Sequence, residues 1–325
     1  MKRTSGLFFV SSVLCAVVLS FAVSAVFAQD YPQKAIRIIV PYAPGGSNDV
    51  TARIIADKLN EVLGQRGLVD NRPGADQRIG ADMVAKAAPD GYTLLLTSTP
   101  STFPCLFKKL PFDVEKDFAG ITIGGRSPNF LFVNPSVPAK TVDELVKLAK
   151  SQPGKLNYAT TGVGQMPHLN GEMFKMLAGV DIMHVPFKGS SESVKAVLGG
   201  HVEMGFGSVA SSISQVQAGT LRALAITGDK RSPLAPDVPT MVESGLNFVT
   251  YTWNGIFAPA KTPKEIVTKL NTAIVKILKM PDVIESLKKN GLDASPCTPE
   301  ELNKFMKEDI AKWAKVVKSA GIEPQ

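Results

Sequence analysis

A loop with two adjacent glycines is the segment of this sequence best suited to hold a ligand. It runs from Tyr42 to Asp49, between a β-branched run and an amphipathic stretch, and its candidate binding residues are Tyr42, Pro44, Gly45, Gly46, Ser47 and Asp49. The glycines allow a tight turn and a close approach to a ligand, and the free N–H groups of a following helix favour an anion. Ser47 is a good N-cap, and Asp49 could accept the remaining amide donors. The pattern indicates either an anion site or a turn that only reverses the chain.

A second loop of the same character lies in the other half of the chain. Its candidate binding residues are Thr160, Thr161, Gly162, Gly164, Gln165 and His168. Hydroxyls, glycines, an amide and a proline that opens a helix offer another set of donors. Neither loop matches the Walker or the G-x-G-x-x-G pattern. Two such loops in different halves predict a ligand whose anionic group is held from both sides.

Patterns for catalysis and for metal binding are weak. His168 and Glu172 are four residues apart, but the H-E-x-x-H pattern is absent and no G-x-S-x-G elbow occurs. We therefore expect no metal, no cofactor and no catalytic residue. His168 is expected to be structural, with direct ligand contact as the alternative, and His184 is expected to be a hydrogen-bonded core residue.

Composition restricts the class of protein. The 325 residues are 44% hydrophobic and 20% charged, which excludes a disordered, collagenous or coiled-coil chain. The net charge of +7 is not gathered into a basic stripe, so a nucleic acid is not expected as a partner.

Residues 1–28 predict a cleaved secretory signal, with an uncleaved membrane anchor as the alternative. Cys105 and Cys297 could pair in an oxidising compartment, although two free thiols are favoured.

Short β-branched runs alternate with amphipathic stretches after the signal, which favours an α/β architecture with largely parallel sheets. Strands are expected at 36–40, 93–96, 130–133, 156–159, 183–187, 202–206 and 221–226. Helices are expected from about 50, at 142–150, 168–177, 191–198 and 211–217, and again after Pro263. If the late helices pack on the first sheet, the chain crosses between two lobes near residues 130 and 250. The cleft between them is the default ligand site.

Several motifs together resemble one known family. They include Asn71-Arg72-Pro73-Gly74-Ala75, and matching segments fall at 31–32, 39–46, 89–95, 117–118, 162–164 with 168–169, 184–189, 221–225, 237–240 and 258–259 with 262–263. The chain resembles the periplasmic solute-binding proteins of tripartite tricarboxylate transporters, the Bug or TctC family.

This resemblance implies a two-lobe, type II-like periplasmic binding protein of the Venus flytrap kind, with mixed sheets flanked by helices and a central cleft. Lobe 1 is expected to comprise residues 29–130 and 250–325, and lobe 2 residues 131–249. The protein would work in the periplasm as a monomer. It would capture a small organic carboxylate on the two loops and deliver it to the membrane permease subunits of a transporter.

The resemblance also implies further cleft lining at Thr97, Ser98, Phe206 and Ser208. The chain departs from the family where Asp76-Gln77 replaces a usual Gly-Gly, and where Gly207 or Ser208 replaces a frequent Asp. Two alternative functions remain: a ligand-sensing subunit for a signalling system, or a secreted hydrolase with Ser47 or Ser98 as nucleophile.

Overall fold

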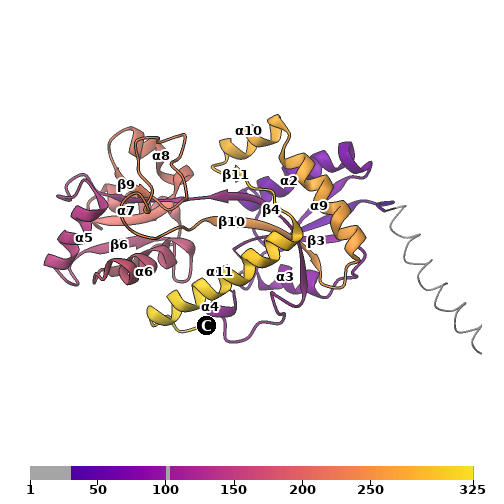
Figure 1. Cartoon of the computed structure of the whole chain (residues 1–325), viewed down its shortest axis with the longest axis horizontal. Coiled ribbons are helices and arrows are strands. Elements are labelled where there is room, and N and C mark those ends of the chain that lie inside the picture. The colour runs from indigo at the N-terminus through magenta and orange to yellow at the C-terminus, as the bar shows by residue number, and fades with distance from the viewer. Residues whose placement is uncertain (1–30, 100–102, 325) are drawn as a thin grey trace, which may run out of the picture.

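Two mixed β-sheets, each covered by helices on both faces, make up the fold (Figure 1). The computed structural model describes residues 31–99 and 103–324, so the predicted signal at 1–28 lies outside the described residues. None of the helices within those ranges combines the length and the apolar composition needed to cross a membrane.

The first sheet has six strands in the order β11-β4-β10-β3-β1-β2. Strands β1, β2 and β3 are parallel, whereas β4, β10 and β11 are paired antiparallel. Its strands are β1 (Ile36–Val40), β2 (Gly67–Asn71), β3 (Thr93–Ser98), β4 (Phe118–Ser127), β10 (Thr252–Pro259) and β11 (Asp293–Ala294). The helices connected with it are α2 (Ser47–Leu63), α3 (Arg78–Ala85), α4 (Phe103–Leu106), α9 (Lys264–Leu278), α10 (Pro281–Lys289) and α11 (Pro299–Ser319).

The second sheet has five strands in the order β7-β6-β8-β5-β9. Strands β6, β7 and β8 are parallel, and β5 pairs antiparallel with both β8 and β9. Its strands are β5 (Asn129–Val133), β6 (Asn157–Thr160), β7 (Met183–Pro186), β8 (Met204–Ser208) and β9 (Arg222–Ile226). Its helices are α5 (Val142–Ser151), α6 (Met166–Ala178), α7 (Ser190–Leu198) and α8 (Val209–Gln217).

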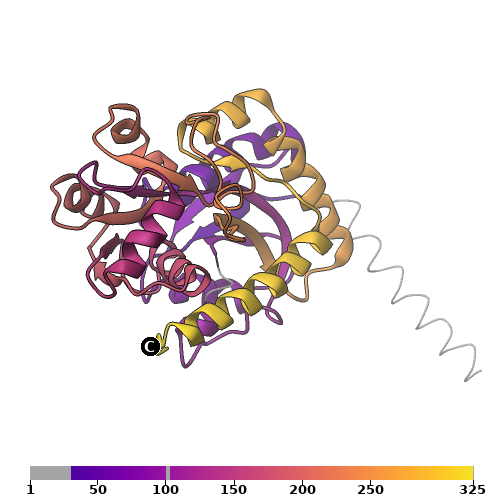
Figure 2. The ribbon, with the colours of Figure 1, turned by 60° about the vertical axis from the view of Figure 1, so that its left-hand side comes forward.

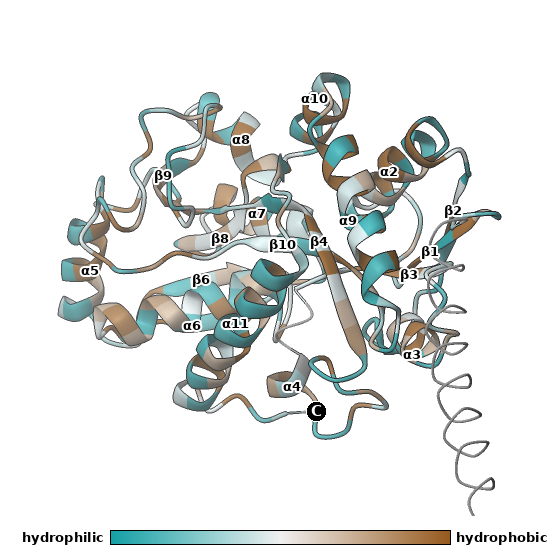
Figure 3. Ribbon diagram, turned by 45° about the vertical axis from the view of Figure 1, so that its right-hand side comes forward, coloured by the Kyte–Doolittle hydropathy of each residue, from teal (hydrophilic) through white to brown (hydrophobic). Residues whose placement is uncertain are grey.

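Alternation along the strands gives each sheet two buried faces. In β1, Ile36, Ile38 and Val40 pack in one core while Ile39 packs in another on the opposite face. In β5, Leu131 and Phe132 divide in the same way between the two cores of the second sheet. The period of two along a strand sends successive side chains to opposite faces, and the helices supply amphipathic partners (Figure 3).

Helix α11 packs against both sheets. Its first turn is fixed by a capping box between Thr298 and Glu301. Leu302 then packs in a core of the first sheet, whereas Trp313 and Val317 pack in a core of the second. Figure 2 shows the helix running from one half of the molecule to the other, where it lies beside α6. The chain end therefore does not belong to the first sheet alone.

The prediction of largely parallel sheets was wrong, because β4, β5, β10 and β11 all pair antiparallel with their neighbours. Strands β4 and β10 were not predicted. Both strands contain glycine, and β10 ends in proline, which weakens the β-branched pattern used to find strands. Both pair antiparallel inside the first sheet. The expectation of mixed sheets flanked by helices is confirmed. Cys105 and Cys297 are free thiols.

Candidate functional site

A cleft of about 310 Å³ lies between the two sheets. Its volume is at the lower end of the range typical of small-molecule sites. Residues from both sheets line it: Tyr42, Asp76, Gln77, Ser98, Thr99, Leu106, Phe107, Asn129, Thr161, Val163, Gly164, Gln165, Met166, Pro167, Ser190, Ser208, Thr252, Ile322 and Glu323.

Strand register explains why residues so distant in sequence meet there. Strands β3 and β8 end at the cleft, β1 and β6 end one or two residues before a lining residue, and the antiparallel strands β5 and β10 begin there. Thus Asn129, the first residue of β5, pairs with Ser208, the last residue of β8. In the first sheet Asn254, two residues after Thr252, pairs with Ser98. The carboxyl edges of the strands are the usual ligand sites of open α/β sheets.

Four helices begin at this cleft. Gln77 and Gln165 are the N-cap residues of α3 and α6, and Ser208 is that of α8. Ser190 is the first residue of α7. All four residues line the cleft. The unpaired N–H groups and the positive dipole ends of these helices therefore favour negative charge.

The charged side chains that line the cleft in the described part of the chain are acidic. They are Asp76 and Glu323, and no described Lys or Arg lines it. An anion bound there would be held by backbone amides, hydroxyls and side-chain amides. Within the described ranges, no group of three His, Cys, Asp or Glu residues could hold a metal ion.

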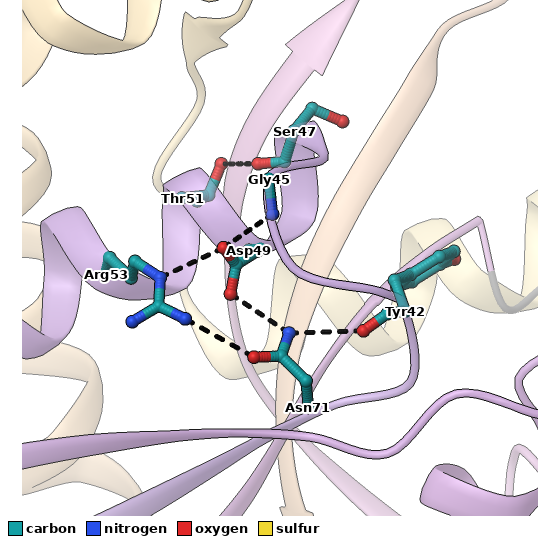
Figure 4. A network of polar contacts seen from close by, with 7 residues as sticks. All are labelled: Tyr42, Gly45, Ser47, Asp49, Thr51, Arg53 and Asn71. Carbon is teal, nitrogen blue, oxygen red and sulfur yellow. Dashed lines mark hydrogen bonds and ion pairs between the residues drawn. The ribbon is translucent and has the colours of Figure 1, made fainter.

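The first glycine loop is organised by the carboxylate of Asp49 (Figure 4). Asp49 is only 3% exposed, and it accepts hydrogen bonds from the Gly45 amide at 2.9 Å, Arg53 Nε at 2.9 Å and Asn71 Nδ2 at 3.0 Å. Burial opposes ionisation, but the hydrogen bonds from Arg53, Gly45 and Asn71 together lower the pKa of Asp49. The expected contact between Asp49 and the loop amides is therefore present at Gly45.

The predicted N-cap at Ser47 was wrong by one residue. Helix α2 begins at Ser47 itself, its N-cap is Gly46, and no side chain caps it. Asp49 provides an acidic side chain in the first turn, so a hydroxyl cap is not needed to balance the helix dipole there.

Tyr42 is the residue by which the first loop reaches the cleft. Its hydroxyl donates to Gln77 Oε1 at 2.5 Å and accepts from the Ser98 amide at 3.2 Å. Pro44, Gly45, Gly46, Ser47 and Asp49 are not part of the cleft lining described above.

The second glycine loop forms one wall of the cleft and is tied down by a histidine. The Gly164 amide donates to His168 Nδ1 at 3.0 Å. This bond fixes the neutral imidazole with its proton on Nε2. His168 is 4% exposed and stacks on His184 at 3.9 Å between ring centroids. His184 Nε2 in turn lies 2.6 Å from the hydroxyl of Thr160.

A buried polar cluster continues beneath this loop. Glu172 Oε1 accepts from the Tyr158 hydroxyl at 2.6 Å and from Lys175 Nζ at 3.1 Å, and it lies 3.9 Å from His168 Nε2. Desolvation, with a contribution from Lys175, lowers the pKa of His168 to about 4. Desolvation and the neighbouring His168 likewise lower that of His184 to about 4. Both rings are therefore neutral at pH 7.

The structure brings six of the sixteen candidate residues to the cleft: Tyr42, Ser98, Thr161, Gly164, Gln165 and Ser208. Thr97, Thr160, Gly162 and His168 are not among the lining residues, but each is adjacent in sequence to one of them. Phe206 instead is fully buried in a core with Phe174 and Phe248. Phe206 and Ser208 are two residues apart on β8, so their side chains point to the same face of the sheet. Phe206 lies farther from the cleft, where helices cover that face.

Sequence reasoning missed other lining residues. Gln77, Thr99, Asn129, Ser190 and Thr252 are polar and line the cleft. The only available signal was the departure from Gly-Gly at positions 76 and 77. Asn129 and Thr252 are the first residues of antiparallel strands, and the sheet register brings them to the site.

Comparison with known proteins identifies the family. The model of the tripartite tricarboxylate transporter family receptor, TctC, matches residues 51–322, most of the chain. The chain belongs to this family. It is 37% identical to the protein BugT of Bordetella pertussis over 300 residues, which are 91% of this chain and 92% of BugT.

Solved structures of family members have the same fold. Rpa4515 of R. palustris, solved with adipate, has a TM-score of 0.76 and 34% identity, covering 91% of this chain and all of that one. MatC from Rhodopseudomonas palustris, with bound malate, has a TM-score of 0.71 and 32% identity, covering 88% and 100%. The predicted family and its periplasmic-binding-protein fold are thus confirmed.

Proposed function

We propose that this TctC-family protein captures a small organic carboxylate in its cleft and delivers it to the membrane permease of a tripartite transporter. The observation that carries this proposal is the convergence of four helix N-termini on a cleft whose described lining contains no Lys or Arg. Such a site selects negative charge through fixed dipoles and neutral donors. The relatives solved with adipate and malate support a carboxylate as the anion.

The proposal also covers where the protein works and how its two lobes move. Residues 1–28 act as a cleaved signal, and the mature chain works in the periplasm as a monomer. Residues 29–130 with 250–325 and residues 131–249 form the two lobes that close on the ligand, and the last turns of α11 bridge them. The two sheets on either side of one cleft support this division.

We also infer that the protein does not hydrolyse its ligand. Ser98 Oγ donates to Asn48 Oδ1 at 2.9 Å, rather than to a base. The Nδ1 atom of His168 already accepts from the Gly164 amide. A serine nucleophile needs a base within hydrogen-bond reach, and neither Ser47 nor Ser98 has a hydrogen bond to His168.

A thermal-shift screen tests the carboxylate site. Adipate and malate are compared with their uncharged diamides, using the purified mature protein. A ligand at about 100 times its dissociation constant adds about 2.7 kcal/mol of stability, which raises the melting temperature by at least about 5 °C. Equal shifts from acids and amides would contradict an anion site.

Delivery to a permease is tested in cells. Deleting the gene should abolish uptake of the carboxylate found in the screen, and a plasmid copy should restore it. Unchanged uptake together with loss of a transcriptional response to that carboxylate would instead favour the sensing role.

A further inference from the structure

Asn129 has a buried, unsatisfied donor at the cleft. The residue is 1% exposed, and within the described part of the chain its Nδ2 atom has no hydrogen-bond partner. Its backbone is fully paired, because its amide donates to Thr227 Oγ1 at 3.0 Å and its carbonyl accepts from the Thr227 amide at 2.8 Å. A buried amide donor without a partner loses its hydrogen bonds to water and gains none in exchange, which destabilises the unliganded protein. A ligand acceptor would remove this cost.

The nearest polar neighbour on the same strand pair does not supply the missing acceptor. Ser208 lies opposite Asn129 in the register of β5 and β8. Its hydroxyl accepts from the Ser211 amide and donates to Ser211 Oγ, as part of the cap of α8. The amide of Asn129 is therefore left to face the cleft that it lines.

Gln77 presents a second side-chain amide to the cleft from the other sheet. Its Oε1 atom accepts from the Tyr42 hydroxyl at 2.5 Å and from Thr97 Oγ1 at 3.2 Å. These two bonds fix the orientation of the amide and leave its NH₂ group on the opposite side. Gln77 lines the cleft, so this NH₂ group can donate to a bound molecule.

The backbone that positions Gln77 is strained. Ala75, Asp76 and Gln77 have φ angles of 45°, 48° and 74°, in the left-handed region that favours glycine. A side chain at Cβ is strained in this region, and such strain is concentrated at functional sites. A turn shaped for chain reversal alone would be more stable with glycine at these positions. The strained turn gives Asp76 and Gln77 side chains that line the cleft.

We infer that Gln77 and Asn129 are specificity-determining residues that donate hydrogen bonds to a second oxygen acceptor of the ligand. This inference rests on the proposed function, in which the helix N-termini hold the first carboxylate. It narrows the ligand class to carboxylates with a second oxygen acceptor, dicarboxylates first. Monocarboxylates with a plain alkyl chain leave both amides unpaired and bind more weakly.

Calorimetric titration with matched acids tests the inference. The probes are adipate against hexanoate, and succinate against butyrate, so that each pair differs only in its second carboxylate. We expect the wild-type protein to bind at least one dicarboxylate more than tenfold more tightly than its monocarboxylate partner. Equal affinities within both pairs would overturn the inference and leave the proposed function intact. Failure of every acid, including the adipate and malate of the thermal-shift screen, would instead reject the proposed function.

Variants separate donation from a structural role. Asn129→Leu removes the donor and keeps the backbone bonds to Thr227. Gln77→Glu keeps an acceptor for Tyr42 and Thr97 but replaces the NH₂ group by a carboxylate oxygen. Each variant should lower the affinity for the preferred dicarboxylate at least tenfold. The affinity for the matching monocarboxylate should change less than threefold. Equal losses for both acids would show a structural role and overturn the inference.

A change of preference provides the sharpest readout. Gln77→Glu should bind 6-aminohexanoate more tightly than the wild type does, because an ammonium group then meets a carboxylate. Asn303→Asp, an exposed residue on α11 outside the cleft lining, adds the same charge and should behave as wild type. If Asn129→Leu does not fold, Asn129→Asp replaces it, and Gln77→Gly, which suits the left-handed turn, replaces a misfolded Gln77→Glu. No gain for 6-aminohexanoate in Gln77→Glu, with adipate binding unchanged, would contradict the assignment.

Discussion

Gly164 and Gly46, one from each glycine loop, differ in whether their backbone conformation requires glycine. Gly164 has a φ of 76°, and a Cβ atom there would lie 3.2 Å from the side chain of Leu106. Gly46 has a φ of −78°, and the nearest atom to its Cβ would be the Ala43 carbonyl oxygen at 4.0 Å. Of these two positions, only 164 has a backbone conformation that requires glycine.

We therefore expect unequal costs of alanine at the two positions. Gly164→Ala should lower the free energy of unfolding by about 1 to 2 kcal/mol, because alanine is strained in the left-handed region. Gly46→Ala should change it by less than about 0.5 kcal/mol. Urea denaturation measures both. Similar losses at the two positions would contradict the geometry given for the loops.

Replacing Asp49 should destabilise the protein more than replacing its ion-pair partner, Arg53. Asp49→Ala leaves the Gly45 amide without its acceptor and takes from Asn71 Nδ2 one of its two acceptors, the other being the Tyr42 carbonyl, so we expect a loss of about 2 to 4 kcal/mol in unfolding free energy. Arg53 is half exposed and can return to water, so Arg53→Ala should cost less than about 1 kcal/mol. Chemical denaturation at pH 7 compares them. A larger loss for Arg53→Ala would mean that the ion pair, and not the loop bonding, stabilises this turn.

At the residue scale, the sequence predicted the cleft residues that lie in a recognisable local pattern. It did not predict those that reach the cleft only through strand pairing. Tyr42 and the loop from Thr161 to Gln165 were found because glycine and hydroxyl residues follow a recognisable strand. Asn129 and Thr252 could not be found, since they reach the cleft through antiparallel registers with Ser208 and the end of β3. Phe206 was misplaced because depth along a strand is not visible in an alternating pattern.

At the scale of elements, the stacked histidines join the start of α6 to strand β7. His168 and His184 have pKa values near 4, below the value of about 6.5 for an unfolded chain. The unfolded state therefore binds more protons between these values. The stability due to the neutral pair is fully present above pH 6.5 and is lost as the pH falls toward 4.

Replacing His168 should flatten this pH dependence. Asn at position 168 offers an oxygen near the place of Nδ1, so His168→Asn keeps an acceptor for the Gly164 amide and cannot titrate. Between pH 7 and pH 4.5 the wild type should lose on the order of 1 to 3 kcal/mol more unfolding free energy than the variant. Urea denaturation at both pH values gives the difference. Parallel losses would show that other groups account for the acid sensitivity.

The helices and the continuous apolar strands were largely predictable, whereas the glycine-containing antiparallel strands β4 and β10 were not. Strands such as β1 and β5 are continuous apolar runs because both faces are buried, and this composition is visible in the sequence. Strand β4 contains three glycines, at positions 120, 124 and 125, against which Leu302, Asn254 and Leu292 pack closely. Glycine is required there by close packing, and that requirement hides the strand.

At the scale of the whole molecule, hydrogen bonds of Thr227 connect the two segments in which the chain passes between the halves. Thr227 Oγ1 accepts from the Asn129 amide and donates to the Thr250 carbonyl at 2.8 Å. The Thr250 amide donates back to the Thr227 carbonyl. The two chain crossings, before β5 and before β10, are thus held side by side. The division into lobes near residues 130 and 250 stays a prediction, and the path of α11 along both sheets was not predicted.

The position of Trp313 and Leu302 on one helix has a consequence for how heat disrupts the protein. Two lobes with separate cores could melt independently, but α11 contributes to a core in each, so loss of either one removes packing from the other. The heat-capacity trace of the mature protein should therefore show one transition, with equal calorimetric and van't Hoff enthalpies. Trp313→Ala, which empties the position in the second core, should split the trace into two peaks, whereas Leu287→Ala, buried beside the first sheet only, should shift one peak downward.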